Sequence, residues 1–151
     1  MKEEKIQVFI DGVNRYFNEV YEFGVDVGTP YLVSNNHPRS EDYTGIIGIS
    51  GDDYRGCVYF TASESLLKKL LVLMEENSRS EDNKRDLVGE IANTISGNAR
   101  SEFGESFMIS VPVVVSGVLD NIHLPKNTHS YVIPITYKNH EAAIVVSLQE
   151  L

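Results

Sequence analysis

A chain of 151 residues with 42 % hydrophobic content fits one folded domain, whose core needs no disulfide or metal to hold it. The formal net charge of −9 argues against a general affinity for nucleic acid or anionic lipid, because either would need a basic patch. Cys57 is the single cysteine, no apolar run is long enough to cross a bilayer, and residues 1–10 lack a secretion leader. Together these features predict a cytoplasmic protein.

The first part of the chain predicts one helix followed by three strands. Residues 6–23 carry apolar side chains three and four positions apart, as in an amphipathic helix that ends at Gly24: Ile6, Phe9, Ile10, Val13, Phe17, Val20 and Tyr21. Residues 25–34 predict a strand and residues 35–42 a loop. A hairpin follows, with arms at 44–50 and 56–60 around the turn residues 51–53.

The middle of the chain predicts a short helix and a linker. Thr61 and Glu64 have the spacing of a capping box that opens a helix over about residues 61–76. Its core face is predicted to carry the apolar residues Leu66, Leu67, Leu70, Leu71 and Met74. The polar residues 75–84 are expected to form a linker.

The last part of the chain predicts the same order again. A long helix spans about residues 86–103 and ends at Gly104, and strands are expected at 107–117, 130–137 and 142–148. Lys138 and Asn139 turn the last hairpin. Pro112 interrupts an apolar run within the first of these strands, which is typical of a sheet edge because proline donates no backbone hydrogen bond.

The doubled order indicates an internal repeat of residues 6–61 and 86–148. Residues 22–24 and 102–104 both read Glu-Phe-Gly, and residues 44–61 align without a gap on residues 130–147. The alternative is chance similarity between two apolar hairpins. If the halves are duplicated, the expected fold is a two-layer α+β domain over 1–151. Two helix-plus-three-strand units would then share one mainly antiparallel six-stranded sheet, with both long helices on one face.

The second long helix has a polar stripe opposite its apolar face. The stripe covers about 80° of the helix and consists of Asp86, Glu90, Asn93, Gly97 and Arg100. Glycines at 89 and 97 each destabilise a helix by about 1 kcal/mol relative to alanine, so another surface is expected to approach closely there. From the pattern alone, an ordinary solvated helix face remains the alternative.

The stripe also carries a motif. Residues 86–93 read Asp-Leu-Val-Gly-Glu-Ile-Ala-Asn, and this resembles the [Ser/Asp]-x-x-x-Glu-x-x-Asn signature of the CheX, CheC and FliY phosphatases. The duplicated layout resembles the CheC-like fold of that family over nearly the whole chain. When the Glu-Phe-Gly tripeptides are superposed, Ile10 and Val13 take the places of Glu90 and Asn93. One site on the second long helix is the arrangement of CheX.

The resemblance implies hydrolysis of the aspartyl phosphate of a CheY-like response regulator. Asn93 would position the attacking water and Glu90 would contact a receiver lysine, while Asp86, Gly97 and Arg100 would contact the partner. The resemblance implies no cofactor of the chain's own, because Mg²⁺ belongs to the receiver's acidic pocket. A non-catalytic adaptor that binds receivers or flagellar switch proteins through the same helix is the second hypothesis.

Other kinds of site find little support in the sequence. The histidines lack the spacing of a metal site, and Cys57 in a predicted strand is interpreted as a core residue. No phosphate-binding glycine loop or nucleophile elbow occurs. CheX relatives dimerise by joining sheets, so both a homodimer and a monomer with a proline-blunted edge are open.

Overall fold

The computed structural model describes residues 3–21, 24–36, 38–117, 124 and 129–151. Three helices and eight strands follow one another as α1 (Glu3–Tyr21), β1 (Asp26–Val27), β2 (Tyr31–Ser34), β3 (Tyr43–Ser50), β4 (Tyr54–Ala62), α2 (Glu64–Leu73), α3 (Glu81–Phe103), β5 (Met108–Ile109), β6 (Val113–Ser116), β7 (His129–Tyr137) and β8 (His140–Glu150). Of the helices in this described part, none is long and apolar enough to cross a membrane.

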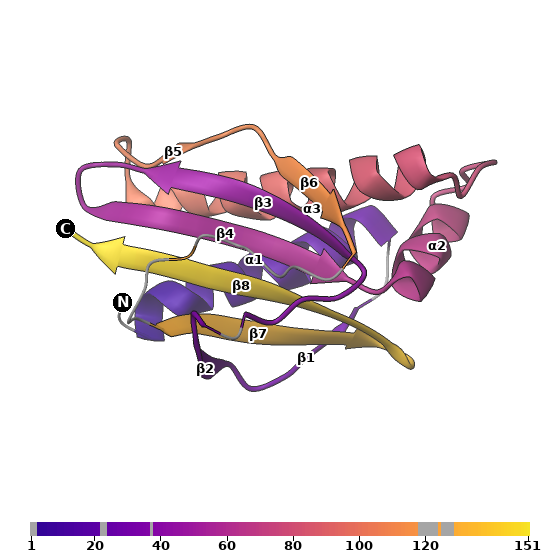
Figure 1. The fold of residues 1–151 in the computed structure, drawn as a ribbon, viewed down its shortest axis with the longest axis horizontal. Coiled ribbons are helices and arrows are strands. Elements are labelled where there is room, and N and C mark those ends of the chain that lie inside the picture. The colour runs from indigo at the N-terminus through magenta and orange to yellow at the C-terminus, as the bar shows by residue number, and fades with distance from the viewer. Residues whose placement is uncertain (1–2, 22–23, 37, 118–123, 125–128) are drawn as a thin grey trace.

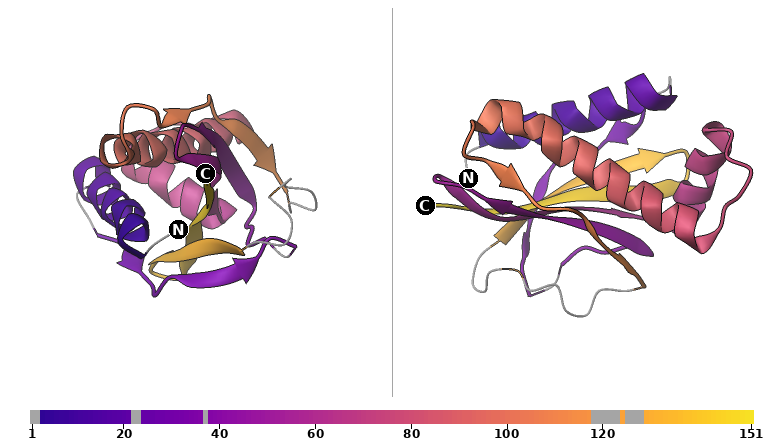
Figure 2. Two further views of the ribbon diagram at one scale, coloured as in Figure 1. Left: turned by 90° about the vertical axis from the view of Figure 1, so that its left-hand side faces the viewer. Right: turned by 90° about the horizontal axis from the view of Figure 1, so that it is seen from above.

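The described strands form one antiparallel sheet. Its order is β1-β7-β8-β4-β3-β5 (Figure 1). The strand β2 pairs with the same edge of β7 as β1 does, and β6 pairs with the same edge of β3 as β5 does. Two short strands therefore share each outer position, and the sheet has six strand positions. The helices α1 and α3 lie on the same face of this sheet, and α2 lies at one end of it (Figure 2). The predicted α+β fold with both long helices on one face is confirmed.

The two central hairpins share one register. Ile47 pairs with Val58 in the first hairpin, and adding 86 to each number gives the pair Ile133 and Ile144 in the second. The strands β4 and β8 meet at Tyr59 and Val145, whose numbers also differ by 86. This relation agrees with the repeat, although the duplication of the sequence itself stays a prediction and Glu22 and Phe23 lie outside the described residues.

Both outer strand positions are broken, where the sequence predicted single strands over 25–34 and 107–117. Between β1 and β2, the backbone N–H of Gly28 donates to the carbonyl of Pro134 at 2.8 Å before the chain turns through Pro30. Between β5 and β6, Ser110 still donates its backbone N–H to the carbonyl of Gly48 at 2.9 Å, and the pairing is interrupted at Val111 and Pro112, the second of which has no N–H to donate. A proline at each break therefore explains why these positions hold two short strands.

The predicted start of the second helix at Thr61 is wrong. Thr61 lies within β4, where its buried hydroxyl accepts from the backbone N–H of Glu41 at 2.6 Å and bonds to the Thr44 hydroxyl at 2.9 Å. A side chain used in this way is not available as a cap. Ser63 caps α2 instead, accepting from the N–H of Leu66 at 3.2 Å.

The end of α2 also differs from the prediction. Leu66, Leu67, Leu70 and Leu71 are buried as expected, but Met74 follows the helix as its C-cap and is 36 % exposed. In α1, Val20 is exposed although its spacing predicted burial, and Tyr16 occupies the core. The apolar spacing therefore identified the two helices but not the positions at their C-terminal ends.

Part of the predicted linker over 75–84 is helical. The helix α3 begins at Glu81, five residues earlier than expected, because Ser80 caps it and accepts from the N–H of Asn83 at 3.1 Å. Lys84 is buried and its ammonium lies 2.8 Å from the Glu64 carboxylate, which joins the start of α3 to α2. Hydrogen bonding to Glu64 is the largest cause of the raised pKa of Lys84, which stays charged at neutral pH.

The helix α3 packs against β3 at Gly45. A Cβ on Gly45 would lie 2.7 Å from the carbonyl oxygen of Val88 and 3.1 Å from the Cα of Gly89. Such a contact is too short for any side chain, so α3 approaches the sheet this closely only because residue 45 is glycine. The apolar face of α3 is buried against the sheet along this line: Leu87, Val88, Ile91, Ala92, Ile95, Ala99 and Phe103.

We expect Gly45→Ala to lower the free energy of unfolding by about 1–3 kcal/mol, because the added methyl group meets the rigid backbone of α3. Gly97→Ala is the matched control, since a Cβ there would meet only Ile109 Cδ1 at an ordinary 3.7 Å. Alanine also favours a helix by up to about 1 kcal/mol over glycine. Urea unfolding of both variants tests this, and equal stability would contradict the packing described for Gly45.

Candidate functional site

The polar stripe of α3 faces solvent. Asp86, Glu90, Asn93 and Arg100 are exposed, and Gly97 is half-buried. The opposite face of the helix packs on the sheet, so the strands do not cover the stripe. The structure thus leaves Glu90 and Asn93, one helical turn apart, open to another molecule.

The side chains of the stripe are also little engaged within the protein. Among the described residues, no hydrogen bond or ion pair holds Asp86, Glu90 or Asn93. Asn93 therefore keeps both its amide donor and its carbonyl acceptor available, while Asp86 and Glu90 keep uncompensated negative charge. A partner that binds here does not first have to break internal contacts of these side chains.

An open groove of about 560 Å³ lies beside Asn93. Its lining is Arg85, Asp86, Gly89, Glu90, Asn93, Pro112 and Val114, so it runs between α3 and the chain that leads into β6. A Cβ on Gly89 would lie 3.0 Å from Val114 Cγ2 and 3.6 Å from Pro112 Cβ. The close approach expected at both mid-helix glycines is thus found at Gly89 but not at Gly97, where the nearest atom would be Ile109 Cδ1 at 3.7 Å. At Gly89 it brings the second wall of the groove, formed by Pro112 and Val114, next to Glu90.

Arg85 holds that second wall in place. Its guanidinium donates to the carbonyl of Val114 at 2.9 Å and to the hydroxyl of Ser116 at 3.2 Å. Arg85 was not among the predicted site residues, because a basic side chain just before the expected helix gave no signal of a contact with a distant strand.

A second hollow lies on the other side of Glu90. It has a volume of about 170 Å³ and is lined by Leu71, Met74, Glu76, Asn83, Asp86, Leu87 and Glu90. Asp86 and Glu90 border both this hollow and the groove beside Asn93, so they form a ridge between the two.

Two tyrosines of α1 lie near this ridge. The hydroxyls of Tyr16 and Tyr21 are 3.2 Å apart, and that of Tyr21 donates to Met74 Sδ at 3.6 Å. Burial raises the pKa of Tyr21 to about 12, and the negative charge of Glu90 adds to the increase. The pKa of Tyr16 is raised for the same reasons, with the neighbouring Tyr21 also contributing. Both hydroxyls therefore stay protonated near neutral pH.

The remaining predicted partner contacts lie further along α3. Gly97 and Arg100 line a separate hollow with Ser101, Gly104 and Glu105, and Arg100 lies 3.7 Å from Met108 Sδ. The structure thus places Asp86, Glu90 and Asn93 on one groove. Gly97 and Arg100 line a different hollow, nearer the C-terminal end of α3.

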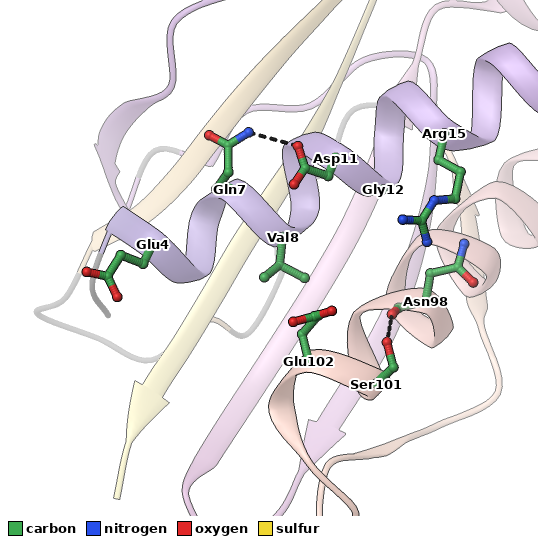
Figure 3. Close-up of a pocket in the computed structure, with 9 residues that line it drawn as sticks. All are labelled: Glu4, Gln7, Val8, Asp11, Gly12, Arg15, Asn98, Ser101 and Glu102. Carbon is green, nitrogen blue, oxygen red and sulfur yellow. Dashed lines mark hydrogen bonds between the residues drawn. The ribbon is translucent and has the colours of Figure 1, made fainter.

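Another groove separates α1 from α3 and holds no member of the stripe (Figure 3). It has a volume of about 190 Å³ and is lined by Glu4, Gln7, Val8, Asp11, Gly12, Arg15, Asn98, Ser101 and Glu102. Gln7 donates to Asp11 at 2.9 Å, and the side chains of Arg15 and Asn98 extend toward each other. Because no residue of the stripe lines this groove, its residues are suitable controls for the stripe.

The counterpart positions on α1 carry no comparable pair. Val13 is fully buried in the core and Ile10 is half-buried. Within the described part of the chain, no three His, Cys, Asp or Glu side chains come together in a way that would hold a metal ion.

A family model described as the chemotaxis phosphatase CheX matches residues 43–136. A CheC-like superfamily protein from Shewanella sp. PV-4 superposes with a TM-score of 0.83 and 26 % identity over 99 % of each chain. CheX from Vibrio vulnificus superposes with a TM-score of 0.81 and 25 % identity, covering 97 % of this chain and 99 % of that one.

A further solved structure is that of the CheX-CheY-BeF3-Mg²⁺ complex from Borrelia burgdorferi. It superposes with a TM-score of 0.76 and 19 % identity, covering 97 % of this chain and 98 % of that one, and at this identity the likeness shows the fold alone. A comparison with curated protein sequences gives no match.

We expect the Cys57 thiol to be unreactive in the folded protein. Burial raises its pKa to about 11, so at pH 8 about one thiol in a thousand is ionised, against about a quarter of ordinary thiols. Iodoacetamide should therefore modify the folded chain roughly a hundredfold more slowly than the urea-unfolded chain. Equal rates, followed by mass spectrometry, would show that the thiol is accessible and ionisable.

Proposed function

Because the chain belongs to the CheX family of chemotaxis phosphatases, we propose that it hydrolyses the aspartyl phosphate of a phosphorylated CheY-like response regulator. The observation that carries the proposal is the exposed pair of Glu90 and Asn93 on α3, unengaged within the described chain and bordered by an open groove. The Borrelia complex of a CheX with CheY supports the choice of partner.

Asn93 is the catalytic residue of the proposal. An aspartyl phosphate is already reactive, so its hydrolysis depends on a positioned water and on stabilised phosphoryl oxygens more than on a strong nucleophile. The amide of Asn93 donates and accepts at once, which suits it to hold a water in line with the leaving carboxylate of the receiver. The water oxygen bonds to phosphorus as the bond from phosphorus to the aspartyl oxygen breaks, without a covalent intermediate on this chain.

Glu90 has a different part in the proposal. A second negative charge close to the phosphoryl group would be repelled, so Glu90 is assigned a contact with a receiver lysine one helical turn away from the chemistry. Asp86 supports this contact from the same ridge. Gly97 and Arg100 are assigned to the outer part of the same docking face, where Arg100 is exposed.

The proposal assigns Mg²⁺ to the receiver. The Borrelia complex contains Mg²⁺ together with CheY and BeF3. In the groove of this chain, the carboxylates of Asp86 and Glu90 lie beside the guanidinium of Arg85. When bound in the receiver, the ion would neutralise charge on the phosphoryl oxygens. We place the activity in the cytoplasm, where the unpaired Cys57 remains reduced.

Asn93→Ala should lower the rate of receiver dephosphorylation at least about a hundredfold while binding persists, because the water loses its positioning group. Asn98→Ala is the matched control, since Asn98 is also an exposed asparagine of α3 but lies on the groove facing α1. Phosphate release from phosphorylated CheY-like receivers is the measurement. Full activity in Asn93→Ala would overturn the mechanism, and binding by the wild-type chain without faster phosphate release would favour the adaptor.

Glu90→Gln should raise the receiver concentration needed for half-maximal rate several-fold and leave the saturated rate close to that of the wild type. The reason is that the substitution removes a docking charge and leaves the amide of Asn93 in place. Glu102→Gln removes an exposed carboxylate from the same helix outside the ridge and should leave both quantities unchanged. If the saturated rate fell instead, with an unchanged half-maximal concentration, Glu90 would belong to the chemistry and not to docking.

A further inference from the structure

The hollow between α2 and the ridge has an apolar lining with negative charge around it. Leu71, Met74 and Leu87 provide the apolar surface, and Glu76, Asp86 and Glu90 provide three carboxylates. Its volume of about 170 Å³ is below the range of about 300–1,000 Å³ typical of small-molecule pockets. It is of the scale that accommodates part of one side chain.

The charges around this hollow are not neutralised within the described chain. None of the described ion pairs includes Glu76, Asp86 or Glu90, and none of the residues lining the hollow is basic. Of the nearby basic side chains, Lys84 is engaged by Glu64 and Glu81, and Arg79 donates to the backbone carbonyl of Glu76 at 3.3 Å without pairing with its carboxylate. The lining of the hollow therefore carries three carboxylates and no basic side chain.

Met74 is the exposed apolar element of the hollow. Its backbone N–H is fixed by the carbonyl of Leu70 at 3.0 Å, and its sulfur accepts from the Tyr21 hydroxyl at 3.6 Å. The side chain thus stays beside Glu90 although 36 % of Met74 is exposed. A thioether adapts its shape to different neighbours and packs well against methylene groups.

We propose that this hollow receives a lysine or arginine side chain from the surface of the docked receiver. The methylene groups of such a side chain would pack on Met74, Leu71 and Leu87, and its charged end would lie among Glu76, Asp86 and Glu90. The inference rests on the proposed function, because the hollow shares Asp86 and Glu90 with the groove beside Asn93. The hollow would thus bind a second basic side chain of the receiver, in addition to the lysine assigned to Glu90. It would also make α2 part of the surface that selects the receiver.

Matched variants test the hollow. Met74→Ser and Glu76→Gln should each weaken binding of a CheY-like receiver loaded with BeF3 and Mg²⁺ about fivefold, and the saturated rate of phosphate release should stay unchanged. Val72→Ser and Glu75→Gln are the controls, since both residues are exposed near the same helix end but do not line the hollow. Met74→Leu should restore binding, and Glu76→Gln should reduce the dependence of affinity on salt.

The outcomes separate this inference from the proposed function. If Met74→Ser and Glu76→Gln bind like the wild type while Asn93→Ala loses activity, the hollow is not a docking site and the phosphatase stands. If both variants weaken binding of a receiver that the wild type does not dephosphorylate, the hollow stands and the phosphatase falls. Absence of any binding by the wild type overturns both, and equal weakening by the control variants overturns the hollow alone.

Discussion

The arrangement of the candidate site depends on the close packing of α3 on β3. At Gly45 the sheet has no side chain, and the carbonyl of Val88 occupies the space where a Cβ would lie. Together with the burial of the apolar face of α3, this close contact sets how the helix lies on the sheet, with its polar stripe turned outward. The backbone of α3 therefore touches the sheet at Val88 and Gly89, while Asn93, one turn further along, stays exposed.

The ridge of Asp86 and Glu90 divides the exposed surface into two regions of different character. On one side, Arg85, Pro112 and Val114 build a wall next to Asn93, and Gly89 lets that wall approach. On the other side, Met74 and Glu76 extend the surface onto α2. A partner that binds on the ridge would contact the amide of Asn93 on one side and the hollow of apolar and acidic residues on the other. The residues that orient the partner can therefore differ from the residue that positions the water.

The two hairpins at the centre of the sheet share one register, yet the long helices α1 and α3 carry different side chains. At the positions that the predicted repeat matches, α3 carries the exposed Asn93, whereas α1 carries Val13, which lies in the core. The candidate site therefore depends on the side chains of one helix and not on the fold alone. In this chain two long helices lie on the same face of the sheet, and the exposed pair of Glu90 and Asn93 is on α3.

The sequence by itself determined the four central strands, the two long helices and the outward direction of the stripe, because the spacing of apolar residues along each element reflects which of its faces is buried. It did not determine that each outer strand would be broken in two. It did not determine where α2 and α3 begin. Thr61 had the spacing of a helix cap, but its hydroxyl bonds to Thr44 and to the backbone N–H of Glu41 within the sheet. Lys84 was expected in the linker, but it is buried and paired with Glu64. Only the tertiary structure decided which residues border the ridge, among them Arg85, Pro112 and Met74. The physical reason is that they come together through contacts between segments distant in the sequence, and the pattern within each segment does not indicate its distant neighbours.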